Sequence, residues 1–124
     1  MIFRSRLGLD VNHAGNDSTT PLYAGSRAGH AEVVSVLLAK QGVNVNQATN
    51  NGATPLYAAS HEGHAEMVSM LLAKQGVDVN QVMNDGATPL YTASQEGHAE
   101  VVSMLLAKQG VDVNQTTNDG FTPL

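Results

Sequence analysis

The tripeptide Thr-Pro-Leu occurs four times at a fixed step of 34 residues, and this step constrains the fold more than any other feature of the sequence. The copies begin at Thr20, Thr54, Thr88 and Thr122. Glycine keeps the same step at Gly8, Gly42, Gly76 and Gly110. A period of this length indicates an array in which each repeat is one supersecondary unit that buries its apolar face against the next unit.

The period describes residues 1–124 as one domain of stacked units. We expect a partial unit at 1–17, full units at 18–51, 52–85 and 86–119, and the start of another unit at 120–124. Both ends of the chain are therefore expected to cut through repeats.

The first half of each unit is predicted to form a short helix, which is clearest in the second full unit. The Thr54 hydroxyl can cap the helix, and Pro55 suits the first helical position because its missing N–H loses no hydrogen bond there. Leu56 and Ala59 lie on one face, and Gly63 can take the left-handed conformation that ends a helix. The equivalent residues are Thr20 and Thr88 at the cap and Gly29 and Gly97 at the end.

A second helix is expected to begin near Ala65 and to stop at Gly76. Glu66 in its first turn and Lys74 in its last turn both suit the helix dipole. Its apolar stripe consists of Val68, Leu71 and Leu72. Neither helix is long enough to be stable alone, so the units must stack into a solenoid.

The residues between units are predicted to form a hairpin-like finger. The run 77–80 is too short and polar for a packed strand, and Asn-Asp-Gly at 84–86 supplies the residues that a tight hairpin turn requires. The stacking predicts a concave face built from finger tips and first helices, and we expect binding to use that face.

Several fixed positions in each unit together resemble the ankyrin repeat. In the second full unit they are GATPLYAA at 52–59, Gly-His at 63–64, Leu-Leu at 71–72, Gly76, and Asp-Val-Asn at 78–80. The resemblance covers nearly the whole chain. It implies an all-α repeat solenoid of stacked helix-turn-helix units with short hairpin fingers, used as a recognition surface for other proteins and rarely for catalysis.

The chain departs from that family in three respects. The family usually has histidine after Thr-Pro-Leu, bonded to the threonine hydroxyl, where this chain has Tyr23, Tyr57 and Tyr91. We expect these rings to cover the joints between units instead, and the bonding around Thr54 and Thr88 to differ. The period exceeds the usual length of about 33 residues by one residue within 73–75, so a slightly longer second helix is expected. Ser18 replaces the glycine of the other units, so the first finger tip is expected to differ in shape.

Composition narrows the classes of partner. The net charge of −5 comes from scattered acids, which disfavours a nucleic-acid partner because such a partner requires a basic stripe. The apolar stretch within 1–9 is too short for a signal peptide or a membrane span, so no membrane partner is predicted. The absence of cysteine excludes a disulfide scaffold and thiolate metal sites. We expect an intracellular, cytoplasmic protein.

Histidine also recurs at the repeat spacing, at His30, His64 and His98. Stacked helices lie about 8 to 10 Å apart, so adjacent copies are too far apart to share a metal ion. In the family this histidine helps to hold the turn between the helices, and the resemblance implies that structural role here. His61-Glu62-Gly63-His64 has the wrong spacing for a zinc-protease motif. No catalytic residue, metal or cofactor is predicted, and the chain is not expected to be an enzyme.

Differences between the second and third full units locate candidate partner-binding residues. They occur at only five pairs of positions: Ala58/Thr92, His61/Gln95, Met67/Val101, Val82/Thr116 and Met83/Thr117. All except the Met/Val pair fall on a first helix or a finger, although neutral drift explains such differences nearly as well. The predicted contact surface for another protein comprises Arg27, His61, Glu62, Gln95 and Glu96 from the first helices and Asn51, Val82, Met83 and Asp85 from the fingers.

An alternative function is a structural or self-associating spacer whose copies stack end to end. Apolar side chains at repeat ends that lack polar caps motivate this alternative. They are Phe3 and Leu7 at one end, and Leu105, Phe121 and Leu124 at the other.

Overall fold

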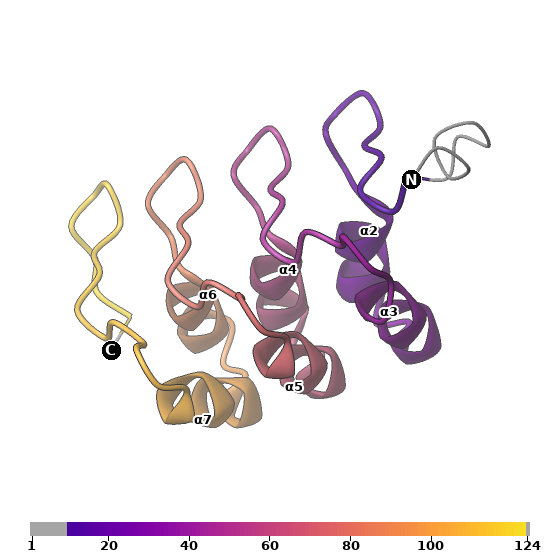
Figure 1. The fold of residues 1–124 in the computed structure, drawn as a ribbon. Helices are drawn as coiled ribbons and strands as arrows, with labels where there is room; N and C mark the ends of the chain where they lie inside the picture. Colours follow the sequence, from indigo (N-terminus) through magenta and orange to yellow (C-terminus); the bar gives the residue numbers. More distant parts are fainter. Residues whose placement is uncertain (1–9, 124) are drawn as a thin grey trace.

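The computed structural model describes residues 10–123. Within this part of the chain, six α-helices form three helix-turn-helix pairs, and there is no β-strand (Figure 1). The pairs are α2 (Pro21–Ala28) with α3 (Ala31–Leu38), α4 (Pro55–Glu62) with α5 (Ala65–Ala73), and α6 (Pro89–Gln95) with α7 (Ala99–Ala107). The predicted all-α solenoid of stacked helix pairs is confirmed.

The helices form two layers (Figure 1). α2, α4 and α6 lie side by side in one layer, α3, α5 and α7 lie in the other, and the loops between pairs project as fingers. Each helix contacts its partner in the pair and its neighbours in the same layer. The apolar core therefore continues from one pair to the next. Its largest fully buried aliphatic side chains are Leu22, Leu56 and Leu90 in the first helices and Val34, Val68, Leu71, Val101 and Leu105 in the second helices.

Each first helix begins with the threonine cap that the sequence predicts. Thr54 accepts a hydrogen bond from the Tyr57 backbone N–H at 3.1 Å, and Pro55 is the first helical residue. Thr20 and Thr88 cap α2 and α6 in the same way. The threonine hydroxyl oxygen thus accepts its hydrogen bond from the tyrosine backbone N–H, and the tyrosine ring takes no part in this bond.

Replacing Thr54 with valine is expected to lower the free energy of unfolding by about 1 kcal/mol. Thr54 is buried, so the Tyr57 N–H loses its acceptor where little water can replace it. Urea denaturation followed by circular dichroism measures the change. Thr116→Val is the matched control, because Thr116 is exposed and valine occupies the equivalent position, Val82, in the preceding unit. Equal midpoints for the two variants would contradict the role of the cap.

The first helices end close to the predicted glycines. Gly29 and Gly63 follow α2 and α4 directly and have left-handed backbone, with φ of 81° and 76°. Gly97 has a similar φ of 78°, but α6 already ends at Gln95, two residues earlier. Glycine therefore makes the same turn toward the second helix in all three pairs.

The second helix ends earlier than predicted. Lys74 has extended backbone angles, φ −75° and ψ 130°, so α5 stops at Ala73 and not at Gly76. The Lys74 ammonium donates a hydrogen bond to the Leu38 carbonyl of the preceding pair at 2.9 Å, which holds this residue across the joint. Part of the stretch that lengthens the period thus lies in the turn after the helix.

The loops between pairs, and also the segments before α2 and after α7, fold back as the predicted hairpin-like fingers. We call residues 15–19, 49–53, 83–87 and 117–121 the first to fourth fingers. In the second finger the Thr49 N–H donates to the Ala53 carbonyl at 2.9 Å, and Gly52 has a φ of 87°. Ser18 takes the same left-handed region in the first finger, with a φ of 66°, and donates its hydroxyl to Asn50 Oδ1 at 2.8 Å. The prediction that Ser18 changes the shape of this tip is wrong, because the bond to the neighbouring finger helps to hold the strained backbone.

The apolar side chains predicted to be exposed at the ends of the stack need one correction. Leu105 is fully buried in the core, so its place in an exposed end stripe is wrong. Leu106, the next residue around α7, is 41% exposed instead, and Phe121 is 60% exposed as expected. Phe3, Leu7 and Leu124 lie outside the described residues.

Candidate protein-binding face

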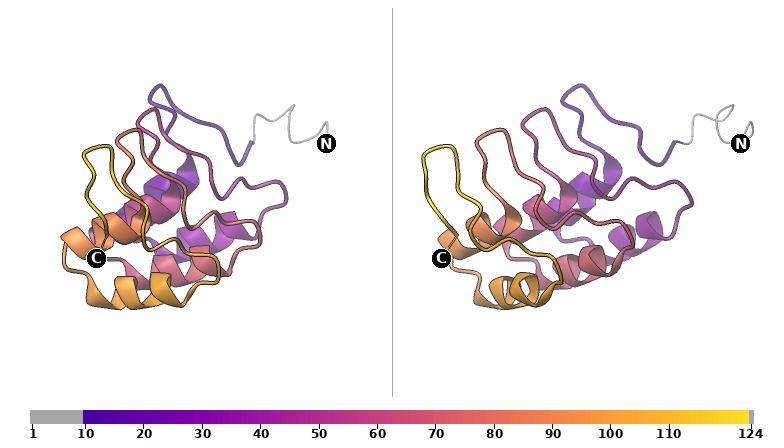
Figure 2. Two further views of the ribbon diagram at one scale, coloured as in Figure 1. Left: turned by 90° about the vertical axis from the view of Figure 1, so that its left-hand side faces the viewer. Right: turned by 60° about the vertical axis from the view of Figure 1, so that its left-hand side comes forward.

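The side of the stack that carries the fingers and the first helices is the candidate site, and we call it the finger face (Figure 2). Each first helix contributes two side chains four residues apart, which share one side of a helix. They are Tyr23 and Arg27, Tyr57 and His61, and Tyr91 and Gln95. The next residue along the chain is exposed in each unit; these residues are Ala28, Glu62 and Glu96, the last directly after α6. The finger face therefore presents a row of tyrosines beside a row of polar side chains.

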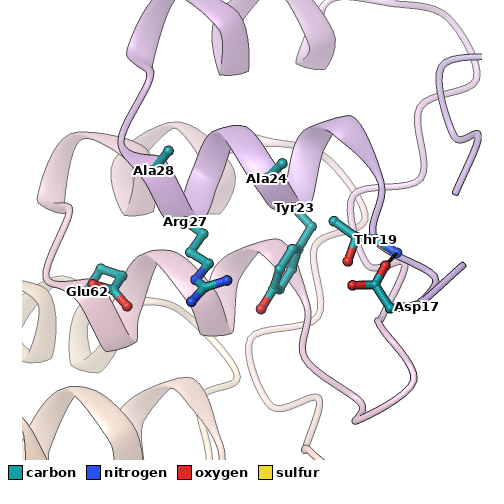
Figure 3. Close-up of a pocket in the computed structure, with 7 residues that line it drawn as sticks. All are labelled: Asp17, Thr19, Tyr23, Ala24, Arg27, Ala28 and Glu62. Atoms are coloured by element: carbon teal, nitrogen blue, oxygen red, sulfur yellow. Dashed lines mark hydrogen bonds between the residues drawn. The ribbon is translucent and has the colours of Figure 1, made fainter. Parts of the chain in front are cut away.

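An open hollow of about 460 Å³ lies at the start of this face (Figure 3). It is lined by Asp17, Thr19, Tyr23, Ala24, Arg27, Ala28 and Glu62. A second hollow of about 350 Å³ shares Asp17, Thr19, Tyr23 and Arg27 and adds Thr49, Asn50 and Asn51. The two hollows show that the first two fingers and α2 line a common surface.

Among the predicted binding residues, Arg27 lines both hollows. Its guanidinium and the Tyr23 ring extend from α2 toward the same side, with Glu62 on one flank and Asp17 on the other (Figure 3). Within residues 10–123 the guanidinium forms no hydrogen bond or ion pair. Its donors are therefore available to a partner.

His61, at the middle of the face, is held in place by its neighbours. Its Nδ1 lies 2.7 Å from the Thr92 hydroxyl of the next unit, and its ring stacks on Tyr57 with centroids 6.1 Å apart. Burial raises the pKa of the Tyr57 phenol above its ordinary value. The Tyr57 ring is thus partly enclosed between units, and His61 presents only part of its ring to a partner.

This contact changes the interpretation of two differences between the second and third units. The comparison of the two units placed Ala58 and Thr92 among the candidate contact positions. Both side chains are buried, so neither is part of an exposed contact surface. Thr92 bonds to His61 across the joint, which links this difference to the His61/Gln95 difference. Packing between units accounts for part of the variation.

The predicted finger residues differ in exposure. Asn51 and Asp85 are exposed at their tips, and Val82 is 38% exposed. Met83 is only partly buried, and its backbone N–H donates to Ala87 within the finger. Of the two apolar residues predicted for the contact surface, Val82 is therefore the more exposed.

The comparison of the second and third units did not identify Asp17, Thr19 and Tyr23 as candidate contact residues, although all three line both hollows. Hydrogen bonds from the Thr19 side chain and backbone lower the pKa of the Asp17 carboxyl, which favours its charged form. Asp85 and Asp119 occupy the same position of the period as Asp17. This recurrence of aspartate could have identified Asp17 as a candidate from the sequence.

The repeated histidines connect one unit to the next. His64 Nε2 lies 3.0 Å from the Arg27 carbonyl, and His98 Nε2 lies 2.9 Å from the His61 carbonyl. These bonds tie the turn of one pair to the last turn of the preceding first helix. His30 has the equivalent position in the first pair, where residues 10–123 provide no preceding pair.

Within the described residues, no group of three or more His, Cys, Asp or Glu side chains is arranged to hold a metal ion. None of the helices between residues 10 and 123 has the length and apolar character needed to cross a membrane.

The family model for ankyrin repeats, which spans three copies of the repeat, matches residues 2–83 and, in a second alignment, residues 72–124. The chain belongs to the ankyrin repeat family. No curated protein matches it significantly. Ankyrin repeats are generally protein–protein interaction modules and are typically not enzymes. A protein-binding role for this chain is consistent with this family.

Proposed function

We propose that this ankyrin chain binds another protein through its finger face, and that the bound segment carries basic side chains over most of the contact. The charge of the face supports this proposal. Its exposed carboxylates are Asp17, Glu62, Asp85, Glu96 and Asp119. Among the described residues, Arg27 is the only lysine or arginine of the first helices and fingers.

Opposite charges on a partner would speed its approach and fix its register on the face. The tyrosine row adds contact area, because a partly buried tyrosine offers both an apolar ring and a polar hydroxyl. A basic side chain of the partner can also lie over such a ring. The expected partner is therefore a segment whose lysines or arginines alternate with apolar groups.

The charges are distributed unevenly along the face, which gives a bound segment a preferred direction. Arg27 lies in the first pair, whereas the acids at 85, 96 and 119 lie toward the last pair and the fourth finger. The end of the segment that carries most positive charge is expected to face α6.

Selection of displayed random peptides on this chain tests the proposal. We expect enriched peptides to carry a net positive charge. The triple variant Glu62→Gln, Asp85→Asn, Glu96→Gln is expected to bind them about 10-fold more weakly, because roughly 1.4 kcal/mol of interaction is lost. Isothermal titration calorimetry measures the difference.

The matched control is the triple variant Glu66→Gln, Asp78→Asn, Glu100→Gln, which removes the same charge away from the first helices and fingertips. Asp85 and Asp78 each accept a backbone hydrogen bond from the residue two positions later at 3.0 Å, so both triple variants lose one such contact. Selected peptides without positive charge, or an equal loss of affinity in both variants, would refute the proposal.

A further inference from the structure

Tyr57 and His61 place two aromatic rings side by side at the middle of the finger face, and we call them the ring pair. The rings are nearly parallel, with 13° between their planes and 6.1 Å between their centroids. Both side chains are partly exposed. They lie on α4, which has a first helix on each side, α2 and α6. Their exposure is therefore a property of the face within the stack.

Contacts to the third unit hold the ring pair in place. The Thr92 hydroxyl lies 2.7 Å from Nδ1 of His61 and fixes the orientation of its ring. Nε2 of His98 lies 2.9 Å from the His61 carbonyl and anchors the end of α4. A binding surface that is already ordered loses less conformational entropy when a partner binds. The ring pair is therefore suited to the recognition of one particular side chain.

The other two units lack a second ring beside their tyrosine. In the first unit Tyr23 is followed four residues later by Arg27, and in the third unit Tyr91 is followed by Gln95. Arg27 thus places a positive charge where the middle unit has an aromatic ring. Among the three described helix pairs, only the middle pair carries the ring pair.

Exposed carboxylates of the third unit and its finger act on the ring pair. Burial is the largest cause of the raised pKa of the Tyr57 phenol, and the negative charges of Asp85 and Glu96 raise it further. Asp85 lies at the tip of the third finger, and Glu96 directly follows α6. Glu62, the neighbour of His61 in the chain, adds a third exposed carboxylate. The space around the ring pair is therefore favourable for a cation.

Aromatic rings close to carboxylates match the chemistry of a guanidinium group. A cation is attracted to the face of an aromatic ring. The planar guanidinium of arginine can lie flat on a ring while its N–H groups donate to carboxylates. The ammonium of lysine is a compact, strongly hydrated charge and cannot stack in this way. The middle of the finger face is thus better suited to arginine than to lysine.

We propose that the ring pair binds one arginine side chain of the partner, with the guanidinium against the rings and its N–H groups directed to Asp85 and Glu96. This inference rests on the proposed function, because it places one side chain of a basic segment on the finger face. It also sets the register of that segment. Stacked helices lie about 8 to 10 Å apart, a distance that about three residues of an extended segment span. A second basic side chain at that spacing on the side of α2 would meet Arg27 and is expected to be disfavoured.

Two displayed peptide libraries of equal positive charge test the inference, one with arginine and the other with lysine as its only basic residue. Peptides enriched from the first library should share one arginine and should lack a second basic residue about three positions away on one side. Replacing the shared arginine with lysine is expected to weaken binding about 5-fold. Isothermal titration calorimetry measures the affinities at pH 8, above the usual titration range of histidine.

Substitutions that other units already contain show whether the ring pair is responsible. His61→Gln introduces the residue that the third unit has at this position, and it should reduce the preference for arginine to less than about 2-fold. Thr92→Ala keeps the ring but removes the hydroxyl that orients it, so a smaller reduction is expected; the equivalent residue of the second unit is already alanine. His13→Gln is the matched control. His13 is exposed outside the finger face and aligns with glutamine in the later units, so this variant should keep the full preference.

The outcomes separate this inference from the proposed function. Equal affinity for the arginine peptide and its lysine counterpart would overturn the inference and leave the proposed function intact, because both peptides are basic. A preference for arginine that survives His61→Gln would overturn it as well. If neither library yields a binding peptide, both the inference and the proposed function are wrong. Circular dichroism confirms that each variant is folded.

Discussion

Replacing Leu71 with alanine is expected to lower the free energy of unfolding by about 3 kcal/mol. The Leu71 side chain is fully buried in α5, the second helix of the middle pair. α5 contacts α4 within its own pair and α3 and α7 on either side. Because α5 has neighbours on three sides, we expect the resulting cavity to close only in part. Urea denaturation followed by circular dichroism measures the loss.

Two further leucines make this prediction specific. Leu105 has the equivalent position in α7 and is also fully buried, but its pair has only one neighbouring pair in the described stack. Leu105→Ala is therefore expected to loosen the last pair first and to broaden the transition, as in other quasi-one-dimensional repeats. Leu106→Ala removes an exposed side chain and should change stability by less than about 1 kcal/mol. Equal losses for Leu71→Ala and Leu106→Ala would contradict this account of the core.

The features that could be predicted from the sequence depend on chemistry within a few residues. The Thr54 hydroxyl and Pro55 define the start of a helix wherever they occur together, because cap and first turn are adjacent in the chain. Gly63 ends the helix because its φ of 76° is accessible to glycine at little cost. The period then copies these local structures along the chain.

The predictions that were wrong depend on contacts between units. Ser18 keeps the geometry of a glycine tip because it bonds to Asn50 in the next finger. Lys74 follows the last residue of α5 and donates to the Leu38 carbonyl of the preceding pair. Leu105 is buried and the adjacent Leu106 is exposed, whereas both equivalent leucines of the middle pair, which has a neighbouring pair on each side, are buried. Asn50 and Leu38 are each more than 30 residues from the side chain that bonds to them.

In the candidate site, too, features that depend on nearby residues could be predicted, and features that depend on contacts between units could not. Exposure of Glu62, Glu96 and Asp85 follows from their positions on a helix end or a finger tip. The two hollows beside Tyr23 together combine residues of two fingers and two first helices, so they form only once the units are stacked. The bond between His61 and Thr92 likewise crosses the joint between two units, and the two residues are 31 positions apart in the chain.

Replacing Gly63 with alanine is expected to lower the free energy of unfolding by about 2 to 3 kcal/mol. Part of this loss arises because alanine is strained at a φ of 76°. The rest arises because the new Cβ would lie 2.6 Å from Nδ1 of His98, so the ring must move. That movement weakens the contact of His98 Nε2 with the His61 carbonyl, which holds two units together.

The three equivalent glycines separate backbone strain from loss of the joint. Their φ angles are nearly equal, at 81°, 76° and 78° for Gly29, Gly63 and Gly97. A Cβ at Gly29 would lie 3.0 Å from the His64 ring, whereas a Cβ at Gly97 would meet nothing within 4 Å. Urea denaturation should therefore rank the losses as Gly63→Ala, then Gly29→Ala, then Gly97→Ala, with only strain of about 1 kcal/mol in the last. In a double-mutant cycle, His98→Ala should remove most of the excess loss at Gly63, because the clashing ring is then absent. Equal losses at all three glycines would mean that the histidine contacts contribute nothing to the joints.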